Sequence, residues 1–209
     1  MEKNKKPYSL GKQQPFAEII ESSLDTFLAQ CWEWNFFPEF GSLVHVTAGK
    51  ASNLGIVTQI NTGSMDPMRY PFPYQKTEEE LLQEQPQIFE FLKTTFRVQI
   101  VGYTANNSQI AYMLPRTPCK IHAFVSACPD TLSTQFFSKP DFLHILFEFS
   151  NQIPNINELL IAIINQLSAK KQLTAQRLDQ FCQTFSLLTG NDYRRLKMFL
   201  KRVERMHVL

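Results

Sequence analysis

Cysteine and histidine are residue types with which this chain could bind a metal ion, and one group of them is close in sequence. Cys119 and His122 are three residues apart, and Cys128 follows soon after. Thiolates and imidazoles at short spacing are typical of zinc sites. On a β-strand, however, positions three apart face opposite sides of the sheet. We therefore expect ordinary packing and surface roles for these residues, and we predict no metal site and no bound cofactor.

Carboxylates offer a second kind of chemistry, because paired acids can hold a catalytic metal ion. Glu18 with Glu21, or Asp66 in a later loop, would suit a metal-dependent nuclease if neighbouring strands supplied further ligands. The three acids at 78–80 have a simpler explanation, because acidic residues are favoured at a helix N-terminus. A carboxylate metal site is therefore an open alternative and not the main expectation.

Nucleotide-binding and hydrolase motifs are absent from the sequence. The two Gly-Lys pairs, Gly11-Lys12 and Gly49-Lys50, lack the other residues of a phosphate-binding P-loop. No G-x-S-x-G, H-E-x-x-H or G-x-G-x-x-G pattern occurs. The sequence predicts that the chain is not an enzyme, with the metal-dependent nuclease as the alternative.

Basic residues are concentrated near the C-terminus. Residues 168–209 include nine basic and three acidic side chains, whereas the whole chain has a net charge of only +2. Such a surface can neutralise nucleic-acid phosphates, although no aromatic residues alternate with the basic ones to stack on bases. We favour a basic face exposed to solvent, with weak nucleic-acid binding as the alternative. The candidate nucleic-acid contacts are Arg194, Arg195, Lys197, Lys201, Arg202 and Arg205.

The composition is that of an ordinary globular protein. The 209 residues suit one domain or two small ones, and 44% are hydrophobic and 19% charged. The four cysteines include no C-x-x-C pair, and the polar N-terminus lacks the apolar region of a signal peptide. No segment has the apolar length of a membrane span. We expect a cytoplasmic protein with reduced thiols and no membrane contact.

From residue 16 to 128 the hydrophobic pattern has a period of two, which indicates β-strands. Alternating segments lie around residues 44–46, 56–60, 97–102, 110–114 and 121–127. Asn106-Asn107 is typical of a hairpin turn. Short strands separated by such turns predict a small β-barrel.

An insertion at 61–96 interrupts this β pattern. Thr77 and Glu80 have the spacing of a capping box that opens a helix, and Pro86 suits the start of a second helical turn. An apolar helix face is expected on that second piece, formed by Ile88, Phe89, Leu92 and Phe96.

The first part of the insertion, residues 61–76, contains three prolines and one glycine, which predict a long, semi-rigid loop. Tyrosine and arginine are enriched at interface hot spots, so the loop is a candidate protein-binding site. The alternative is a strap that folds over the barrel end and buries its aromatic rings. The candidate binding residues are Thr62, Gly63, Asp66, Pro67, Arg69, Tyr70, Phe72 and Tyr74.

Beyond Pro129 the hydrophobic period changes to 3.6, and four amphipathic stripes predict four helices. Pro140 and Thr174 suit helix starts, and Gly190 suits the position just after a helix end. The predicted fold class is α+β. We expect a mobile N-terminal tail at 1–15, a β-barrel domain at 16–128 and a helical domain at 129–209.

The order of several short motifs along 16–128 resembles the HAS-barrel, the N-terminal barrel of HerA-type hexameric ATPases. The HAS-barrel is also related to the small barrel of ATP synthase subunits. The resembling segments include Gly41-Ser42-Leu43-Val44, Thr62-Gly63-Ser64-x-Asp66-Pro67-x-Arg69, Val101-Gly102-Tyr103 and Leu114-Pro115-x-x-Pro118.

The resemblance implies a closed barrel that serves in docking and assembly. In the ATPases such barrels help to form the ring and recruit a partner nuclease. Here the ATPase domain is replaced by the helical unit, so an ATP-driven role is not implied. We expect a non-catalytic docking module that binds a protein partner in trans, either an ATPase or a nuclease. The chain can also form an oligomer.

Overall fold

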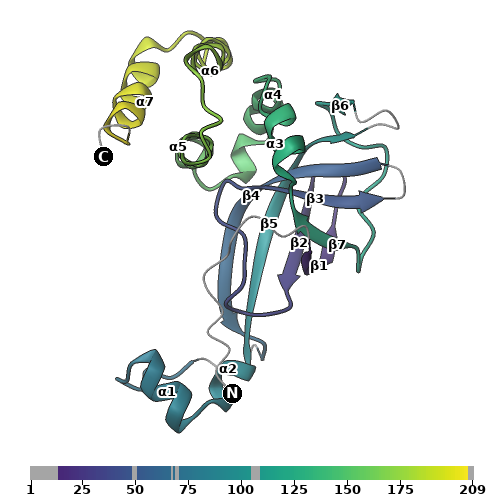
Figure 1. The fold of residues 1–209 in the computed structure, drawn as a ribbon, viewed down its shortest axis with the longest axis vertical. Coiled ribbons are helices and arrows are strands. Elements are labelled where there is room, and N and C mark those ends of the chain that lie inside the picture. The colour runs from purple at the N-terminus through teal and green to yellow at the C-terminus, as the bar shows by residue number, and fades with distance from the viewer. Residues whose placement is uncertain (1–13, 49–50, 67, 69–70, 105–108, 207–209) are drawn as a thin grey trace.

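A computed structural model describes residues 14–48, 51–66, 68, 71–104 and 109–206 of the chain. Figure 1 shows a β-barrel with a group of helices at one end of the long axis and a narrow projection at the opposite end. The predicted tail lies mostly outside the described residues, as does the predicted Asn106-Asn107 turn. Within the described residues, the first strand begins at Pro15, just inside the predicted tail.

Six antiparallel strands close the barrel. Their order is β2-β1-β7-β3-β4-β5, and a further pairing between β2 and β5 completes the ring. A short strand, β6 (Ile110–Ala111), extends the sheet beyond β5. The barrel strands are β1 (Pro15–Ser22), β2 (Thr26–Cys31), β3 (Leu43–Ala48), β4 (Ala51–Ser64), β5 (Leu92–Thr104) and β7 (Phe124–Ala127). The predicted α+β fold with an N-terminal barrel is therefore confirmed.

Several predicted boundaries in the β region are wrong. Leu92 and Phe96 belong to strand β5 and not to a helix, because Leu92 pairs with Ser64 and Phe96 with Ile60 across the β4–β5 ladder. The strand expected at 110–114 ends at Ala111, since Tyr112 turns toward the helices and donates a hydrogen bond to the Phe136 carbonyl at 2.6 Å.

The strand expected from residue 121 begins only at Phe124. His122 has a φ of 66°, which lies in the left-handed region and is incompatible with an extended strand. The turn at His122 also places Cys119 and His122 on different parts of a loop, so the strand geometry assumed for that pair does not apply.

The four predicted amphipathic stripes each form a helix. Asn155 and Thr174 cap two of them, because each side chain accepts a hydrogen bond from the backbone N–H three residues later. Gly190 follows one helix with a φ of 65°. These helices are α4 (Phe142–Glu148), α5 (Ile156–Ala169), α6 (Ala175–Leu188) and α7 (Tyr193–Met206). The structure adds α3 (Asp130–Phe136) and a 3₁₀ turn (Ser150–Gln152), neither of which the pattern predicts.

We call the barrel and helices α3–α7 the body. Two hydrophobic clusters hold the body together. One fills the barrel and includes Phe16, Ile19, Phe96 and Ile100. The other joins the outer surface of strands β3, β4 and β5 to helices α3–α7. Ile100 and Val101 are neighbours on β5, and both are 0% exposed because one faces the barrel interior and the other faces the helices. The strands of the barrel therefore have one core on their inner side and a second core, shared with the helices, on their outer side.

No described helix combines the length and the apolar character that a bilayer-spanning helix needs.

Candidate functional site

The ends of β4 and β5 leave the barrel together and form a projection that we call the arm, residues 61–95. Its strands pair from Asn61 with Thr95 to Ser64 with Leu92. The Met65 N–H then donates to the Phe91 carbonyl at 2.7 Å. Two short helices lie at its end, α1 (Glu78–Glu84) and α2 (Gln87–Glu90). Figure 1 shows them at the opposite end of the long axis from α6 and α7.

The arm is fixed to the barrel by the segment between β2 and β3, which contacts helix α2 and the arm end of strand β5. The indole of Trp34 stacks on the Phe89 ring, with centroids 5.5 Å apart and planes at 20°. The Thr94 hydroxyl hydrogen-bonds the Trp34 carbonyl, and it also lies 2.8 Å from the Thr62 hydroxyl. These contacts give the arm a defined direction from the barrel.

Helix α1 is stabilised locally and not by burial. The predicted capping box is present, with Thr77 and Glu80 each bonded to the other's backbone N–H. Hydrogen bonds from the backbone N–H and then the side chain of Thr77 to the Glu80 carboxyl hold the pKa of that carboxyl below its ordinary value. Lys76 forms an ion pair with Glu84. Neither α1 nor α2 contains a buried residue.

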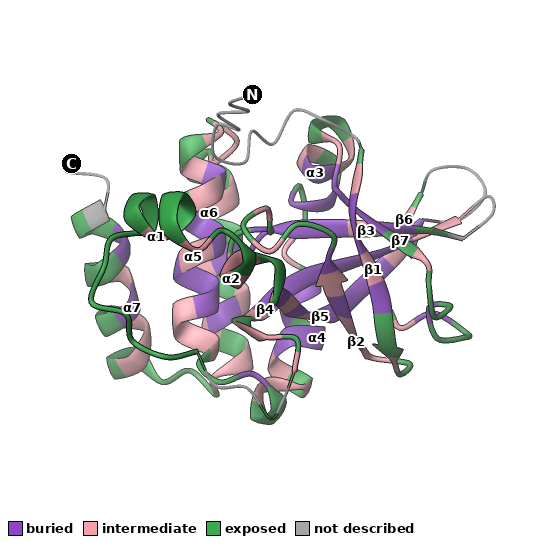
Figure 2. Ribbon diagram, turned by 90° about the horizontal axis from the view of Figure 1, so that it is seen from below, coloured by how far each residue is buried: buried purple, intermediate pink, exposed green. Residues whose placement is uncertain are grey.

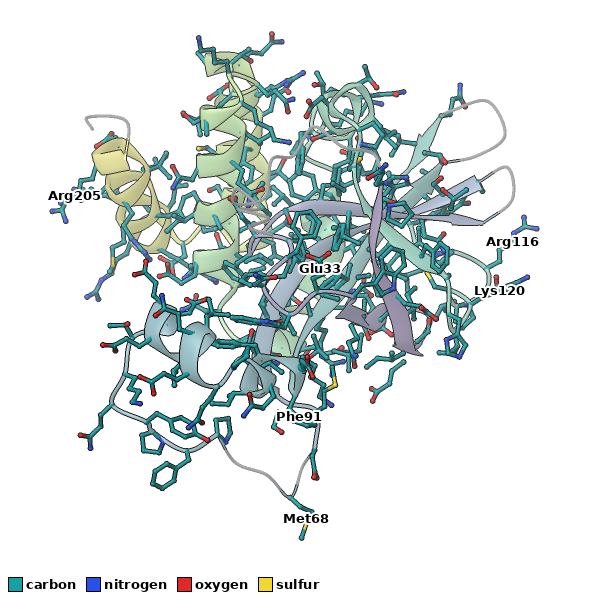
Figure 3. All side chains as sticks on the ribbon, turned by 60° about the horizontal axis from the view of Figure 1, so that its bottom comes forward. Glu33, Met68, Phe91, Arg116, Lys120 and Arg205 are labelled. Atoms are coloured by element: carbon teal, nitrogen blue, oxygen red, sulfur yellow. The ribbon has the colours of Figure 1, made fainter. Side chains whose placement is uncertain are left out.

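The described part of the arm exposes several large apolar side chains. Figure 2 shows α1 and the chain leading to it as exposed, in contrast to the body. In Figure 3 Met68 lies at the outermost point of the arm and points away from the ribbon. The exposed fractions are 48% for Met65, 91% for Met68, 71% for Phe72, 39% for Tyr74, 48% for Leu82 and 47% for Phe91.

Most of the predicted loop residues lie in this arm. Thr62 and Gly63 are in the extended end of β4, which corrects the prediction that the loop begins at residue 61. The Asp66 carboxylate accepts a hydrogen bond from the Met68 N–H at 2.9 Å. The rings of Phe72 and Tyr74 meet edge to face, 5.8 Å apart, and both are exposed. A strap with buried aromatic rings does not fit these two side chains.

Pro67, Arg69 and Tyr70 lie outside the described residues. Sequence reasoning missed Met65, Met68, Leu82 and Phe91 as members of the exposed set. The sequence around Leu82 could have indicated its exposure. Three consecutive acids precede the Leu81-Leu82 pair on a short helix, which leaves too few apolar residues for a wide buried stripe.

Helix α7 carries the predicted basic residues, and the structure divides them into two groups. Arg202 forms a bidentate ion pair with Glu158 of α5, which raises the pKa of Arg202 and lowers that of Glu158. Arg195 donates to the Asn157 side chain at 3.0 Å and lies over the rings of Phe147 and Phe185. Both arginines therefore connect α7 to its neighbours.

The remaining basic residues of α7 are exposed, and no described side chain pairs with them. They are Arg194, Lys197, Lys201 and Arg205. Spacings of three, four and four residues place them along one side of the helix, together with Met198, which is 62% exposed. Beside them is an open surface pocket of about 310 Å³, lined by Asn157, Asp192, Arg194, Arg195, Met198, Phe199 and Arg202.

A further pair of exposed aromatic side chains lies on the barrel and was not predicted. Trp32, just after β2, meets Phe124 of β7 edge to face at 5.3 Å. They are 52% and 55% exposed. Trp32 and Phe124 are 92 residues apart in the sequence, and only the closed barrel brings them together.

The residues considered for a metal site are not brought together. The Cys119 thiol accepts a hydrogen bond from Asn53 at 3.1 Å and belongs to the barrel core, whereas Cys128 belongs to the helical cluster. His122 and Glu18 hydrogen-bond to each other at 2.6 Å on the surface. Among the described residues, no group of three or more histidine, cysteine or acidic side chains has the arrangement of a metal site.

The cysteines are free thiols: Cys31, Cys119, Cys128 and Cys182. Burial raises the pKa of Cys31 and of Cys128 to about 12, so both stay protonated and pack as small apolar side chains.

No protein-family model matches this chain, and no curated protein matches it.

Proposed function

We propose that this chain is a non-catalytic docking module that binds a protein partner through the arm. One observation carries the proposal: a braced projection exposes six large apolar side chains, and its two helices bury none of their residues. Scattered apolar residues are normal on protein surfaces, but their concentration on one element is typical of interaction sites. Methionine and aromatic residues are also enriched in protein interfaces.

The arm also differs from a simple connection between strands. A two-residue turn is enough to join antiparallel neighbours, whereas the chain uses 27 residues between Ser64 and Leu92. Long connections in small domains are usually functional or disordered. The capping box, the ion pair and the Trp34–Phe89 stack hold the helical part of the arm in place, which supports a functional connection.

The class of partner follows from the sequence resemblance to HAS-barrels. In HerA-type ATPases such barrels serve ring formation and nuclease recruitment, so we infer that the partner is an ATPase or a nuclease. Helices α3–α7 follow the barrel directly in this chain, and we propose that the partner acts in trans.

Affinity capture with three tagged proteins tests the proposal. The arm variant Met68→Ser, Phe72→Ser, Leu82→Ser removes exposed apolar surface without touching the core. The matched control Leu187→Ser removes a side chain that is 70% exposed on α6. We expect wild type and control to bind one ATPase or nuclease in a stoichiometric complex that survives high salt and nuclease treatment, and the arm variant to lose it. Equal capture by all three proteins would refute the proposal.

A second function, nucleic-acid binding, is favoured by the four exposed cations of α7 that no described side chain neutralises. Fluorescence anisotropy with a duplex oligonucleotide tests it. Four phosphate contacts predict a loss of roughly 100-fold in affinity between 50 and 200 mM salt. The variant Arg194→Gln, Lys197→Gln, Lys201→Gln, Arg205→Gln should abolish this salt dependence. Absence of binding at 50 mM salt would exclude the function.

A further inference from the structure

Helix α1 presents a small acidic face with an apolar centre. Helical spacing places Glu78, Glu79 and Leu82 on one side, and Leu82 is 48% exposed. The two carboxylates are exposed and have no partner among the described residues. Glu80 and Glu84, by contrast, are engaged by the capping box and by Lys76. The charge that α1 offers to another molecule is therefore concentrated around Leu82.

Helix α7 presents the opposite arrangement. Met198 is 62% exposed and lies among Arg194, Lys197, Lys201 and Arg205. The adjoining 310 Å³ pocket is lined in part by the apolar side chains of Met198 and Phe199, and arginine side chains also line it. It is large enough for a leucine side chain, and three arginines line it together with Asp192 and Asn157.

The two faces are complementary in charge, and each has an exposed apolar side chain at its centre. They cannot meet within one molecule, because Figure 1 shows α1 and α7 at opposite ends of the long axis. A second copy of the chain, however, can bring its α1 to the α7 of the first. Contact between two different surfaces leaves one of each free on the pair, so it can be repeated head to tail.

We propose that the arm of one copy docks on the basic face of α7 in another copy, with Leu82 seated in the pocket and with Glu78 and Glu79 facing the cations. This inference rests on the proposed function of the arm as a docking surface, and it adds a second copy of the chain to the ATPase or nuclease proposed above. One short helix against one longer helix buries less surface than a standard interface, so the association is weak. Because the charged groups are exposed, salt weakens it further.

Two variants test this contact. The acidic-face variant is Glu78→Gln, Glu79→Gln, Leu82→Ser. The basic-face variant is Arg194→Gln, Lys197→Gln, Lys201→Gln, and Met198→Glu is a second, independent change on the same face. All of these side chains are exposed. The charge-matched control is Arg116→Gln, Lys120→Gln, Lys139→Gln. Figure 3 shows Arg116 and Lys120 on the opposite side of the molecule from Arg205.

Sedimentation velocity of nuclease-treated protein at 50 and 500 mM salt gives the readout. We expect wild type and the control to associate at 50 mM salt, in proportion to concentration, and to dissociate at 500 mM. Each face variant alone should remain monomeric. An equimolar mixture of the two face variants should form a dimer of twice the monomer mass and nothing larger, because each supplies only one working face.

Three results would overturn the inference: a monomeric wild type at millimolar concentration in 50 mM salt, association that either face variant retains, or failure of the mixture to dimerise. The capture experiment separates this outcome from failure of the docking function. A monomeric wild type whose arm still captures a different protein refutes only self-association. An arm variant that keeps every partner refutes both.

Discussion

Strands β4 and β5 form one continuous ladder that passes through two environments. Inside the body Ile56, Val57, Val98 and Ile100 are 0% exposed. In the arm the same ladder continues from Asn61 to Ser64 with the same backbone pairing, but among these described residues only Thr94 is buried and the others are half-buried or exposed. Backbone hydrogen bonds therefore do not distinguish the two halves, whereas side-chain burial does. Since apolar burial dominates folding free energy, the body half determines stability and the arm half is free to serve binding.

The largest test of this contrast compares one phenylalanine from each region. Phe96 is 0% exposed in the barrel and packs on the Phe16 ring at 5.8 Å, whereas Phe72 of the arm is 71% exposed. Phe96→Ala should lower the free energy of unfolding by about 3–5 kcal/mol because it leaves a cavity. Phe72→Ala should change it by less than about 0.5 kcal/mol. Urea denaturation measures both, and equal losses would contradict the contrast.

Two glycines of the β4–β5 ladder give a second test of the contrast between body and arm. A Cβ on Gly102 would lie 2.6 Å from the Ala111 carbonyl oxygen, whereas a Cβ on Gly63 would meet nothing within 4 Å. Gly102→Val should therefore lower the free energy of unfolding by about 1–3 kcal/mol. Gly63→Val makes the same chemical change in the arm and should be neutral or slightly stabilising, because valine favours strands. An unchanged melting temperature for Gly102→Val would argue against the close approach of β6.

Loss of the contact between the arm and Trp34 should have a smaller and more local effect on stability. Phe89→Ala removes the stack on Trp34, which is worth about 1 kcal/mol for an aromatic pair. We expect faster hydrogen exchange at the Met65 amide, which donates to Phe91 next to that stack. The urea midpoint of the body should stay close to that of wild type. Met68→Ala, at the exposed tip, is the control, and should leave the exchange rate unchanged. A matching loss of global stability would mean that arm and body unfold together.

The sequence predicted the body better than the arm, for a physical reason. Period-two alternation at residues 44–46 and 3.6 periodicity in α5 both reflect contact with a core, and both elements formed as expected. Helix α3 was missed because it is short and only Ser133 and Phe136 are buried on it, which is too little to define a stripe.

The arm lacks such a pattern. Leu92 and Phe96 are four residues apart, a spacing that suits a helix, and only their pairing with β4 shows them to be in a strand. The candidate docking residues were recognised by composition, but the projection that exposes them depends on two strands extending past their barrel.

The basic residues of α7 were predicted as one set, but the sequence did not show which of them are paired with neighbouring helices and which remain available to a partner. Arg195 and Arg202 are occupied by Asn157 and Glu158, which are 38 and 44 residues away in sequence. Such pairing follows from helix packing and is invisible to spacing along α7. The residues available to a partner are therefore fewer than the sequence indicated, and they lie on one side of the helix.

The smallest expected effect is the pH dependence of stability, which a histidine in the body and a glutamate in the arm should change in different ways. Burial lowers the pKa of His45 on β3, although backbone hydrogen bonds at Ala127 and Ser126 oppose the shift. The unfolded chain therefore binds a proton more readily than the folded one, so stability is full above the unfolded pKa, about 6.5, and falls as pH drops below it. The pKa of Glu80 in the arm is also lowered, but an acid contributes its stability above its own unfolded pKa, about 4.3.

The two groups thus act in separate pH windows and on different regions. Between pH 7 and 5, the whole body should lose stability through His45, and His45→Gln should flatten this part of the curve in urea denaturation. Below about pH 4.3, Glu80 should affect only α1, seen as faster exchange at the Glu80 amide, which donates to Thr77. Glu80→Gln should flatten that second change alone. If Glu80→Gln altered the global curve between pH 7 and 5, the arm would be coupled to the core and the separation of stability from binding would be wrong.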